Sequence, residues 1–167
     1  MKKSLLFFCC LVLAMIITYP TNSKAYVLNN QNVGYNPQYT NLSSANAYLP
    51  HLKNAEKWTY TGGKVFLSEY TGSGTVNIYQ GFVDTDNGTY GVCYYNTSRE
   101  SDIRYYRLFK NASPAVRNET VVHEVGHAIG LRHTQTVNDA NAVMREFGFN
   151  NIAAPLSDDK AGINAKY

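Results

Sequence analysis

The sequence HEVGHAIGLRH, residues 123–133, holds three of the four histidines of this 167-residue chain. On a helix, His123 and His127 share one face because they are four positions apart. Their nitrogens can then reach one metal ion at about 2.0–2.1 Å. Gly130 has no Cβ and can take a left-handed backbone conformation, which ends the helix and turns the chain back. His133 can then reach the same ion, so the stretch predicts a zinc-binding helix followed by a sharp turn.

Glu124 gives this predicted metal site its chemistry. Three neutral histidines leave the fourth zinc position for a water molecule, whose pKa the ion lowers toward about 7. Glu124 directly follows the first ligand, so we expect it to accept the water's proton and pass it to a leaving amine. An ordinary polar helix face would not need three histidines, a glutamate and a glycine at these positions. His51 stands alone and is expected to be a surface or capping residue.

The stretch matches the pattern His-Glu-x-x-His-x-x-Gly-x-x-His, and through it the chain resembles the metzincin zinc proteases. Metzincins also have a methionine in a tight turn beneath the metal, and Ala142-Val143-Met144 is similar in type and in distance from the histidines. The resemblance implies that Met144 forms a hydrophobic floor for the imidazoles and is not a ligand. A methionine that only fills the core is the alternative, because methionine packs well in irregular gaps.

Within this group the chain is most similar to the matrixins. Residues 156–167 look like the matrixin C-terminal helix, and residues 55–58 look like the end of the first matrixin helix. Astacins and serralysins place a tyrosine ligand two residues after the methionine, where this chain has Glu146. The resemblance implies an α+β fold, in which a twisted five-stranded mixed sheet lies over a zinc-binding active-site helix, with a Met-turn and a C-terminal helix.

The resemblance also implies where a substrate would lie. An extended polypeptide would pair with the edge strand of the sheet, for which residues 90–95 are the candidate. The loop of residues 145–154 would shape the pocket beyond the scissile bond, with Phe147 and Phe149 as candidate lining residues. We expect a monomer whose partner is a polypeptide substrate.

Away from the histidines, the sequence pattern predicts both strands and helices. Alternating apolar and polar residues predict four strands with glycine-rich or polar turns beside them. Ser113 is a good N-cap and Pro114 a favoured first residue for a helix that runs to about Ile129. Residues 26–39 are expected to form an irregular arm with one short strand. The predicted strands are residues 64–70, 75–82, 90–95 and 103–109, the turns include 87–88 and 96–102, and further helices are expected from Ser43 or Ser44 to Trp58, kinked or restarted at Pro50, and from Leu156 to Lys166.

The first 25 residues have the features of a removable export signal. Two lysines precede 13 apolar residues from Leu5 to Ile17, and Ser23-Lys24-Ala25 offers a small-residue cleavage site. An uncleaved membrane anchor is the alternative, although a spanning helix needs about 20 apolar residues. We therefore expect a secreted, extracellular protein without a transmembrane anchor, in which residues 26–167 form a single metalloprotease catalytic domain.

Charge and cysteine content narrow the class further. The signal carries three of the 15 basic residues and none of the 12 acidic ones, so residues 26–167 hold 12 of each. A chain that is neutral after export lacks the electrostatic footprint of a nucleic-acid-binding protein. Cys93 is the single cysteine in residues 26–167, so no internal disulfide is expected. We expect Cys93 to be a buried strand residue, and a zinc-blocking thiolate is the alternative.

A calcium site is a further question that the sequence raises. Asp84-Thr85-Asp86-Asn87-Gly88 offers oxygen atoms to a calcium ion, but the segment lacks the full spacing of a calcium loop. A hairpin turn at Asn87-Gly88 accounts for the segment better. The sequence therefore supports one catalytic zinc ion and gives no support for a calcium ion.

The sequence leaves three functions open. The first is a secreted zinc-dependent endopeptidase. The second is a zinc amidase or exopeptidase of narrow specificity, acting on small or cell-wall peptides, which an enclosed cleft with a charged group at one end would favour. The third is a non-catalytic zinc-binding interaction module, which would not need Glu124. The sequence shows no such enclosed cleft, and Glu124 is present, so the endopeptidase is the leading hypothesis.

Overall fold

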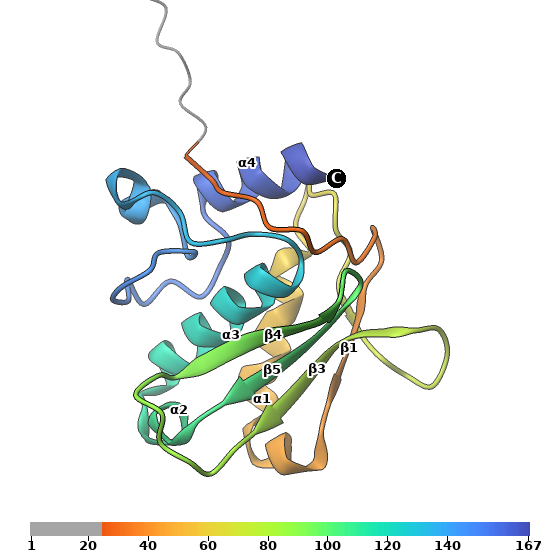
Figure 1. Ribbon diagram of the computed structural model, residues 1–167, viewed down its shortest axis with the longest axis vertical. Coiled ribbons are helices and arrows are strands. Elements are labelled where there is room, and N and C mark those ends of the chain that lie inside the picture. Colours follow the sequence, from red (N-terminus) through yellow and green to blue (C-terminus); the bar gives the residue numbers. More distant parts are fainter. Residues whose placement is uncertain (1–24) are drawn as a thin grey trace, which may run out of the picture.

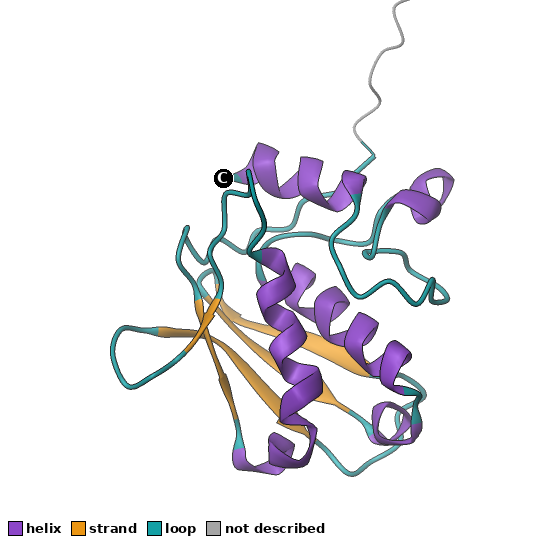
Figure 2. Cartoon of the chain, turned by 180° about the vertical axis from the view of Figure 1, so that it is seen from behind, coloured by secondary structure: helices purple, strands orange, loops and turns teal. Residues whose placement is uncertain are grey.

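The computed structural model describes residues 25–167, in which helices pack against one face of a sheet (Figures 1 and 2). The predicted export signal lies outside the described residues, apart from Ala25. Within the described part of the chain, no helix has both the length and the apolar character needed to span a membrane. The elements are β1 (Gln38–Asn41), η1 (Ser43–Tyr48), α1 (Leu49–Leu52), η2 (Lys53–Trp58), β2 (Ser68–Glu69), β3 (Val76–Phe82), β4 (Gly91–Thr97), β5 (Glu100–Tyr105), α2 (Arg107–Asn111), α3 (Pro114–Ala128), η3 (Thr136–Asn141) and α4 (Ser157–Lys166), where η denotes a 3-10 helix.

The sheet is mixed and has five strands in the order β2-β1-β3-β5-β4. The first four strands in this order run parallel, whereas β4 is antiparallel to β5. β4 lies at one edge, so one side of its backbone has N–H and C=O groups without a neighbouring strand. The α+β fold with a five-stranded mixed sheet, implied by the metzincin resemblance, is confirmed.

Two of the predicted turns are wrong. The sequence predicts a turn over residues 96–102, but β4 continues to Thr97 and β5 begins at Glu100. These two residues are paired in the antiparallel ladder, so hydrogen bonding between the strands outweighs their polar character. The predicted hairpin at residues 87–88 is also wrong, because β3 and β4 are not neighbours. β5 lies between them, and the segment is a loop that crosses the end of β5.

Two predicted strands have different boundaries in the structure. The strand expected over residues 64–70 is reduced to the two residues of β2. The strand expected over residues 103–109 ends at Tyr105, and Phe109 belongs to α2. Phe109 is fully buried against Tyr105, with ring centroids 4.5 Å apart. Phe109 is therefore apolar because it is buried in the core, and not because it belongs to a strand.

The helix α3 packs beside α1 and η2 on one face of the sheet (Figure 2). As predicted, it begins at Pro114 and is capped by Ser113, whose Oγ accepts a hydrogen bond from Val116 N at 3.3 Å. Trp58 of η2 is fully buried beside α3 and donates its Nε1–H to Val122 O at 2.9 Å. This packing fixes α3 against the rest of the core.

The predicted first helix is divided into η1, α1 and η2. Pro50 lies in the first turn of α1, where its missing N–H costs no hydrogen bond, so the predicted interruption at Pro50 is observed. The predicted serine cap is wrong. Leu42 occupies the N-cap position of η1 and makes no side-chain hydrogen bond, while Ser44 Oγ accepts one from Phe82 N of β3 at 3.2 Å.

Candidate metal centre

The turn after α3 folds the chain back at Gly130. Its φ is +117°, a conformation that side chains with a Cβ rarely adopt. Gly130 N donates to His127 O at 3.2 Å, and Leu131 N donates to Gly126 O at 2.9 Å. This pair of bonds forms the Schellman motif that commonly ends a helix at a glycine. The reversal brings His133 to the face of α3 that carries the other two histidines.

The three histidine side chains converge on one point. The Nε2 atoms of His123 and His127 each lie 3.2 Å from the Nε2 atom of His133. Tetrahedral zinc, with Zn–N distances of about 2.0–2.1 Å, needs ligand nitrogens about 3.3–3.4 Å apart. The residues therefore fit zinc and leave a fourth position open. Within residues 25–167, this is the one group of three or more His, Cys, Asp or Glu side chains arranged to hold a metal ion.

Backbone carbonyl groups orient two of the three rings. His123 Nδ1 lies 2.9 Å from Val143 O, and His127 Nδ1 lies 2.9 Å from Leu131 O. A carbonyl oxygen can only accept a hydrogen bond, so each Nδ1 carries the proton. Each Nε2 then keeps its lone pair for a metal ion, which is the arrangement that metal-binding histidines usually show.

Burial keeps the imidazoles neutral. Desolvation lowers the pKa of His123 well below its usual value, and it lowers the pKa of His127 to about 4. Desolvation also lowers the pKa of His133, while the charges of Glu146 and Asp139 act in the opposite direction. Because metal ions bind neutral imidazole, the site is prepared for coordination at neutral pH.

The Met-turn packs directly beneath α3. Met144 is almost fully buried and belongs to the hydrophobic core. Gly126 makes the close approach possible, because a Cβ at this position would overlap the Met144 sulfur. The same Cβ would lie 2.7 Å from Trp58 Cζ2. Met144 of the turn therefore packs directly against the helix backbone at Gly126, between His123 and His127.

Asp159 of α4 holds the backbone of the Met-turn. Its carboxylate accepts hydrogen bonds from Val143 N at 2.7 Å, from Met144 N at 3.2 Å and from Leu156 N at 2.7 Å. Burial raises the pKa of Asp159 to about 6, and the three backbone N–H groups oppose this shift. Since Val143 O orients the ring of His123, Asp159 connects α4 to the metal centre through a single residue.

Glu124 lies next to the histidines and is 7% exposed. Burial raises its pKa to about 8, and the backbone amide of Cys93 opposes this shift. A nearby cation favours the charged form of a carboxyl group, so a divalent metal ion would return Glu124 to the form that can act as a base. A Cβ at Gly91 would lie 2.9 Å from Glu124 Cγ. The absence of a side chain at Gly91 therefore lets β4 pack against the predicted base.

A cleft extends along β4 to both sides of Glu124. It has two parts, with volumes of about 330 Å³ and 430 Å³. The larger part extends along β4 as far as Tyr95, and its lining includes His127 and His133. The two parts meet at a shared set of residues: Thr89, Gly91, His123, Glu124 and Glu146.

The smaller part of the cleft is lined by aromatic residues, as the sequence predicts. Phe147 and Phe149, from the loop after the Met-turn, line it together with Tyr90 and Thr120. The rings of Tyr90 and Phe149 meet edge to face, with centroids 5.0 Å apart. This pair closes one wall of a pocket large enough for an apolar side chain.

His51 and Cys93 have structural environments that differ from those of the three clustered histidines. His51 Nδ1 lies 2.7 Å from Asn118 Oδ1, so His51 links α1 to α3 and is only partly buried. Cys93 is a free cysteine in β4 and lines the larger part of the cleft. Burial raises the pKa of its thiol, which favours the protonated form over a zinc-blocking thiolate.

A comparison with protein families agrees with this geometry. Residues 10–134 match the family model described as Metallo-peptidase family M12B, Reprolysin-like. The chain belongs to this reprolysin-like metallo-peptidase family. The matched residues include all three clustered histidines and Glu124, so the prediction of a metzincin-type zinc protease is confirmed at the level of the family. A comparison with curated proteins finds no match.

Solved structures resemble this metallo-peptidase in fold. "Structure of myroilysin" superposes with a TM-score of 0.61 at 16% identity, covering 85% of this chain and 98% of that one. "Crystal structure of myroilysin" gives a TM-score of 0.55 at 16% identity, covering 89% and 88%. "GM1 bound form of the ECX AB5 holotoxin" gives 0.58 at 14% identity, covering 85% and 88%. At these identities the likeness concerns the fold alone.

Sequence reasoning missed three residues that shape the site of this metallo-peptidase. Gly91 and Gly126 matter because a neighbour distant in sequence occupies the space of their missing side chains. No local pattern reports such a contact. Asp159 has a local signal, because an acidic residue is favoured in the first turn of a helix. Its bonds to the Met-turn, however, depend on how α4 packs.

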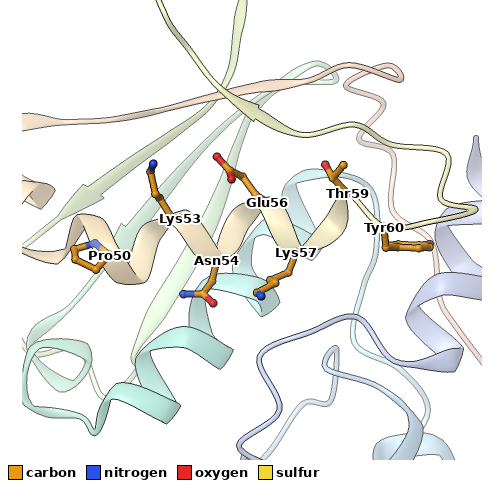
Figure 3. Close-up of a pocket in the computed structure, with 7 residues that line it drawn as sticks. All are labelled: Pro50, Lys53, Asn54, Glu56, Lys57, Thr59 and Tyr60. Carbon is orange, nitrogen blue, oxygen red and sulfur yellow. The ribbon is translucent and has the colours of Figure 1, made fainter.

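A cavity of about 580 Å³ lies away from the cleft, along the outer side of α1 and η2 (Figure 3). It shares no lining residue with either part of the cleft. In Figure 3 Lys53 and Glu56 point to one side of the helical segment and Asn54 and Lys57 to the other, as on an ordinary solvated helix. Its volume exceeds that of either part of the cleft, but none of the candidate site residues belongs to it. The lining residues are Pro50, Lys53, Asn54, Glu56, Lys57, Thr59 and Tyr60.

Proposed function

We propose that the protein is a secreted zinc endopeptidase that cleaves internal bonds of polypeptides lying extended along β4. The observation that carries this proposal is the distribution of charge in the cleft. Glu124 and Glu146 both lie where the two parts of the cleft meet. The lining residues that belong to only one part include no Lys, Arg, Asp or Glu. A peptidase that recognises a chain terminus needs a charged group at one end, so the cleft favours internal bonds.

Substrate binding would use the edge strand. An extended polypeptide can add a strand beside β4, so that backbone hydrogen bonds supply affinity without depending on sequence. Passing Gly91, this polypeptide would place its scissile peptide bond beside Glu124, which lies against that glycine. The side chain beyond the scissile bond would enter the aromatic pocket formed by Tyr90 and Phe149.

The chemistry would be divided between a zinc ion and Glu124. His123, His127 and His133 would hold the ion through Nε2, and bound zinc supplies a Lewis acid that polarises the substrate carbonyl and activates water. Glu124 accepts a proton as the water oxygen adds to the carbonyl carbon. It then gives that proton to the amide nitrogen as the C–N bond breaks. The second proton of the water passes from the new carboxyl group to the amine, so the products are a carboxylate and an ammonium group, and Glu124 is ionised again.

Export, a monomeric state and a matrixin-like subtype are also part of the proposal. Export is supported by the apolar run from Leu5 to Ile17 and the small-residue site that follows it. The matrixin-like subtype is supported by the C-terminal helix α4 and by Glu146, which stands where astacins and serralysins have a tyrosine ligand. N-terminal sequencing of the exported protein tests the first point, with Tyr26 as the expected first residue.

The decisive experiment measures cleavage of an unfolded protein by the exported protein and by its Glu124→Ala variant, with zinc content determined for both. We expect the wild type to cleave internal bonds, to stop with a chelator and to recover with zinc. The variant should hold zinc and be inactive. If both proteins hold one zinc ion and neither cleaves, the endopeptidase proposal is wrong. A narrow-specificity amidase or a non-catalytic zinc-binding module would then take its place.

A further inference from the structure

The N-terminal arm, residues 25–33, lies directly against the loop that carries His133. Leu28 and Leu131 form an antiparallel bridge. On one side of it Arg132 N donates to Val27 O at 2.8 Å, and on the other Asn29 N donates to Gly130 O at 2.9 Å. In Figure 1 the arm passes between α4 and the segment that follows α3. The arm thus covers the end of the zinc-binding helix.

One side chain of this arm reaches beneath the metal ligands. Asn29 is 7% exposed. Its Nδ2 lies 2.9 Å from both His127 O and Leu131 O, and 3.1 Å from the hydroxyl of Tyr95 in β4. Its Oδ1 accepts a hydrogen bond from Gln31 N at 2.8 Å. The two carbonyl groups need a donor and the backbone N–H needs an acceptor, so the orientation of the amide is fixed by its partners.

The two carbonyl groups bound by Asn29 belong to the environment of one ligand. Leu131 O is the acceptor that orients the ring of His127 through Nδ1, and the other carbonyl is that of His127 itself. A carbonyl oxygen has two lone pairs, so Leu131 O can accept from the imidazole and from the amide together. Asn29 therefore fixes the acceptor of the His127 ring and the backbone from which that ring projects.

We propose that Asn29 is a positioning residue for the metal centre. It is contributed by a segment of chain 98 positions before His127. Without its amide, the Leu131 peptide would lose a buried donor and could turn away from the imidazole. Outer partners of metal ligands typically change metal affinity by about 10–100-fold when they are removed. The inference rests on the proposed zinc site, but it does not depend on peptidase activity.

The competing explanation is that Asn29 only attaches the arm to the fold. Lys166 offers a matched control, because its Nζ donates to the backbone oxygen of Asn29 at 2.9 Å. This bond attaches the arm at the same residue but does not involve the Asn29 side chain. Asn30 is the second control, since it is an exposed asparagine in the same arm. If the arm merely has to be attached, Lys166→Met should weaken zinc binding as Asn29→Ala does.

The test measures the zinc dissociation constant by competition with a chelator and the urea unfolding midpoint of the metal-free protein. We expect Asn29→Ala to bind zinc about 10–100-fold more weakly. The zinc dissociation constants of Asn30→Ala and Lys166→Met should stay within about threefold of the wild-type value. The absorption spectrum of the cobalt-loaded Asn29→Ala variant should also change, because the ligand geometry is relaxed. A folded Asn29→Ala variant with wild-type zinc affinity overturns the proposal.

A second measurement uses the unaltered protein and applies even if Asn29→Ala does not fold. Zinc is added to the metal-free protein while the side-chain amide signals of its asparagines are followed by NMR. We expect the Asn29 amide signals to shift and their hydrogen exchange to slow, while those of Asn30 stay unchanged. If zinc binds and leaves the Asn29 amide unaffected, Asn29 does not position the ligands. If the unaltered protein binds zinc but cleaves no peptide, the proposed function is refuted and this inference stands.

Discussion

Replacing Gly126 by alanine should destabilise the protein, although alanine is the better helix former. In an exposed helix interior this change stabilises by about 1 kcal/mol. At Gly126 the new Cβ would overlap the Met144 sulfur and lie 2.7 Å from Trp58 Cζ2. Both neighbours are almost completely buried and cannot move into solvent. Overpacking of this kind costs about 1–3 kcal/mol, and the contact with two large side chains places the cost near the upper end.

The expected net loss is therefore about 1–2 kcal/mol. With a urea slope of about 1–3 kcal/mol/M, the unfolding midpoint should fall by about 0.5–1 M. Ala115→Gly, at an exposed position in the first turn of the same helix, gives a lower limit for the helix-propensity term in this protein. Displacement of the Met-turn should also move the Val143 carbonyl that orients His123, so zinc affinity should fall by about tenfold. A Gly126→Ala variant as stable as the wild type would refute this account of the packing.

Three further outcomes follow from the cleft and the ligands. Gly91→Ala should displace Glu124, because its Cβ would lie 2.9 Å from Glu124 Cγ, so kcat/KM should fall at least about tenfold while zinc content stays normal. Phe149→Ala opens the aromatic pocket beside Tyr90, so profiling of cleaved peptides should show a weaker preference for large apolar residues; an unchanged profile contradicts the role of the pocket. In the metal-free protein the pKa of His127 is lowered to about 4, so its neutral form stabilises the fold above about pH 6.5, and this contribution is lost as the pH falls toward 4. An NMR titration should show no protonation of His127 between pH 7 and 5, and a midpoint near 6.5 would contradict the burial argument.

The sequence predicts the catalytic part of the fold well because its signals are local. Ser113 and Pro114 mark the start of α3, and Gly130 marks its end through a conformation that suits glycine. The spacing of His123 and His127 places both on one helix face, independent of anything outside the helix. The edge strand is found for a similar reason, since its aromatic and β-branched residues favour a strand whatever lies beside them.

The connections between strands are predicted less well because they depend on partners distant in the chain. Asn87-Gly88 is a strong hairpin signal in isolation, yet β5 inserts between the two strands that it joins. The polar residues from Asn96 to Asp102 look like a turn, but most of them pair within the β4–β5 ladder. Strand order is a property of the whole sheet, so no pattern within a few residues contains it.

The metal centre is held from three directions, and this couples metal binding to the order of distant segments. The ring of His127 depends on Leu131 O, which the N-terminal arm contacts through Asn29. The ring of His123 depends on Val143 O, whose residue is fixed by Asp159 of α4. His133 lies on the loop between Leu131 and the Met-turn. Because zinc binds only the folded arrangement, its binding free energy stabilises the arm, the Met-turn and α4 together. Removal of zinc should therefore increase hydrogen exchange first in these three segments, before it affects strands β3 and β5 in the interior of the sheet.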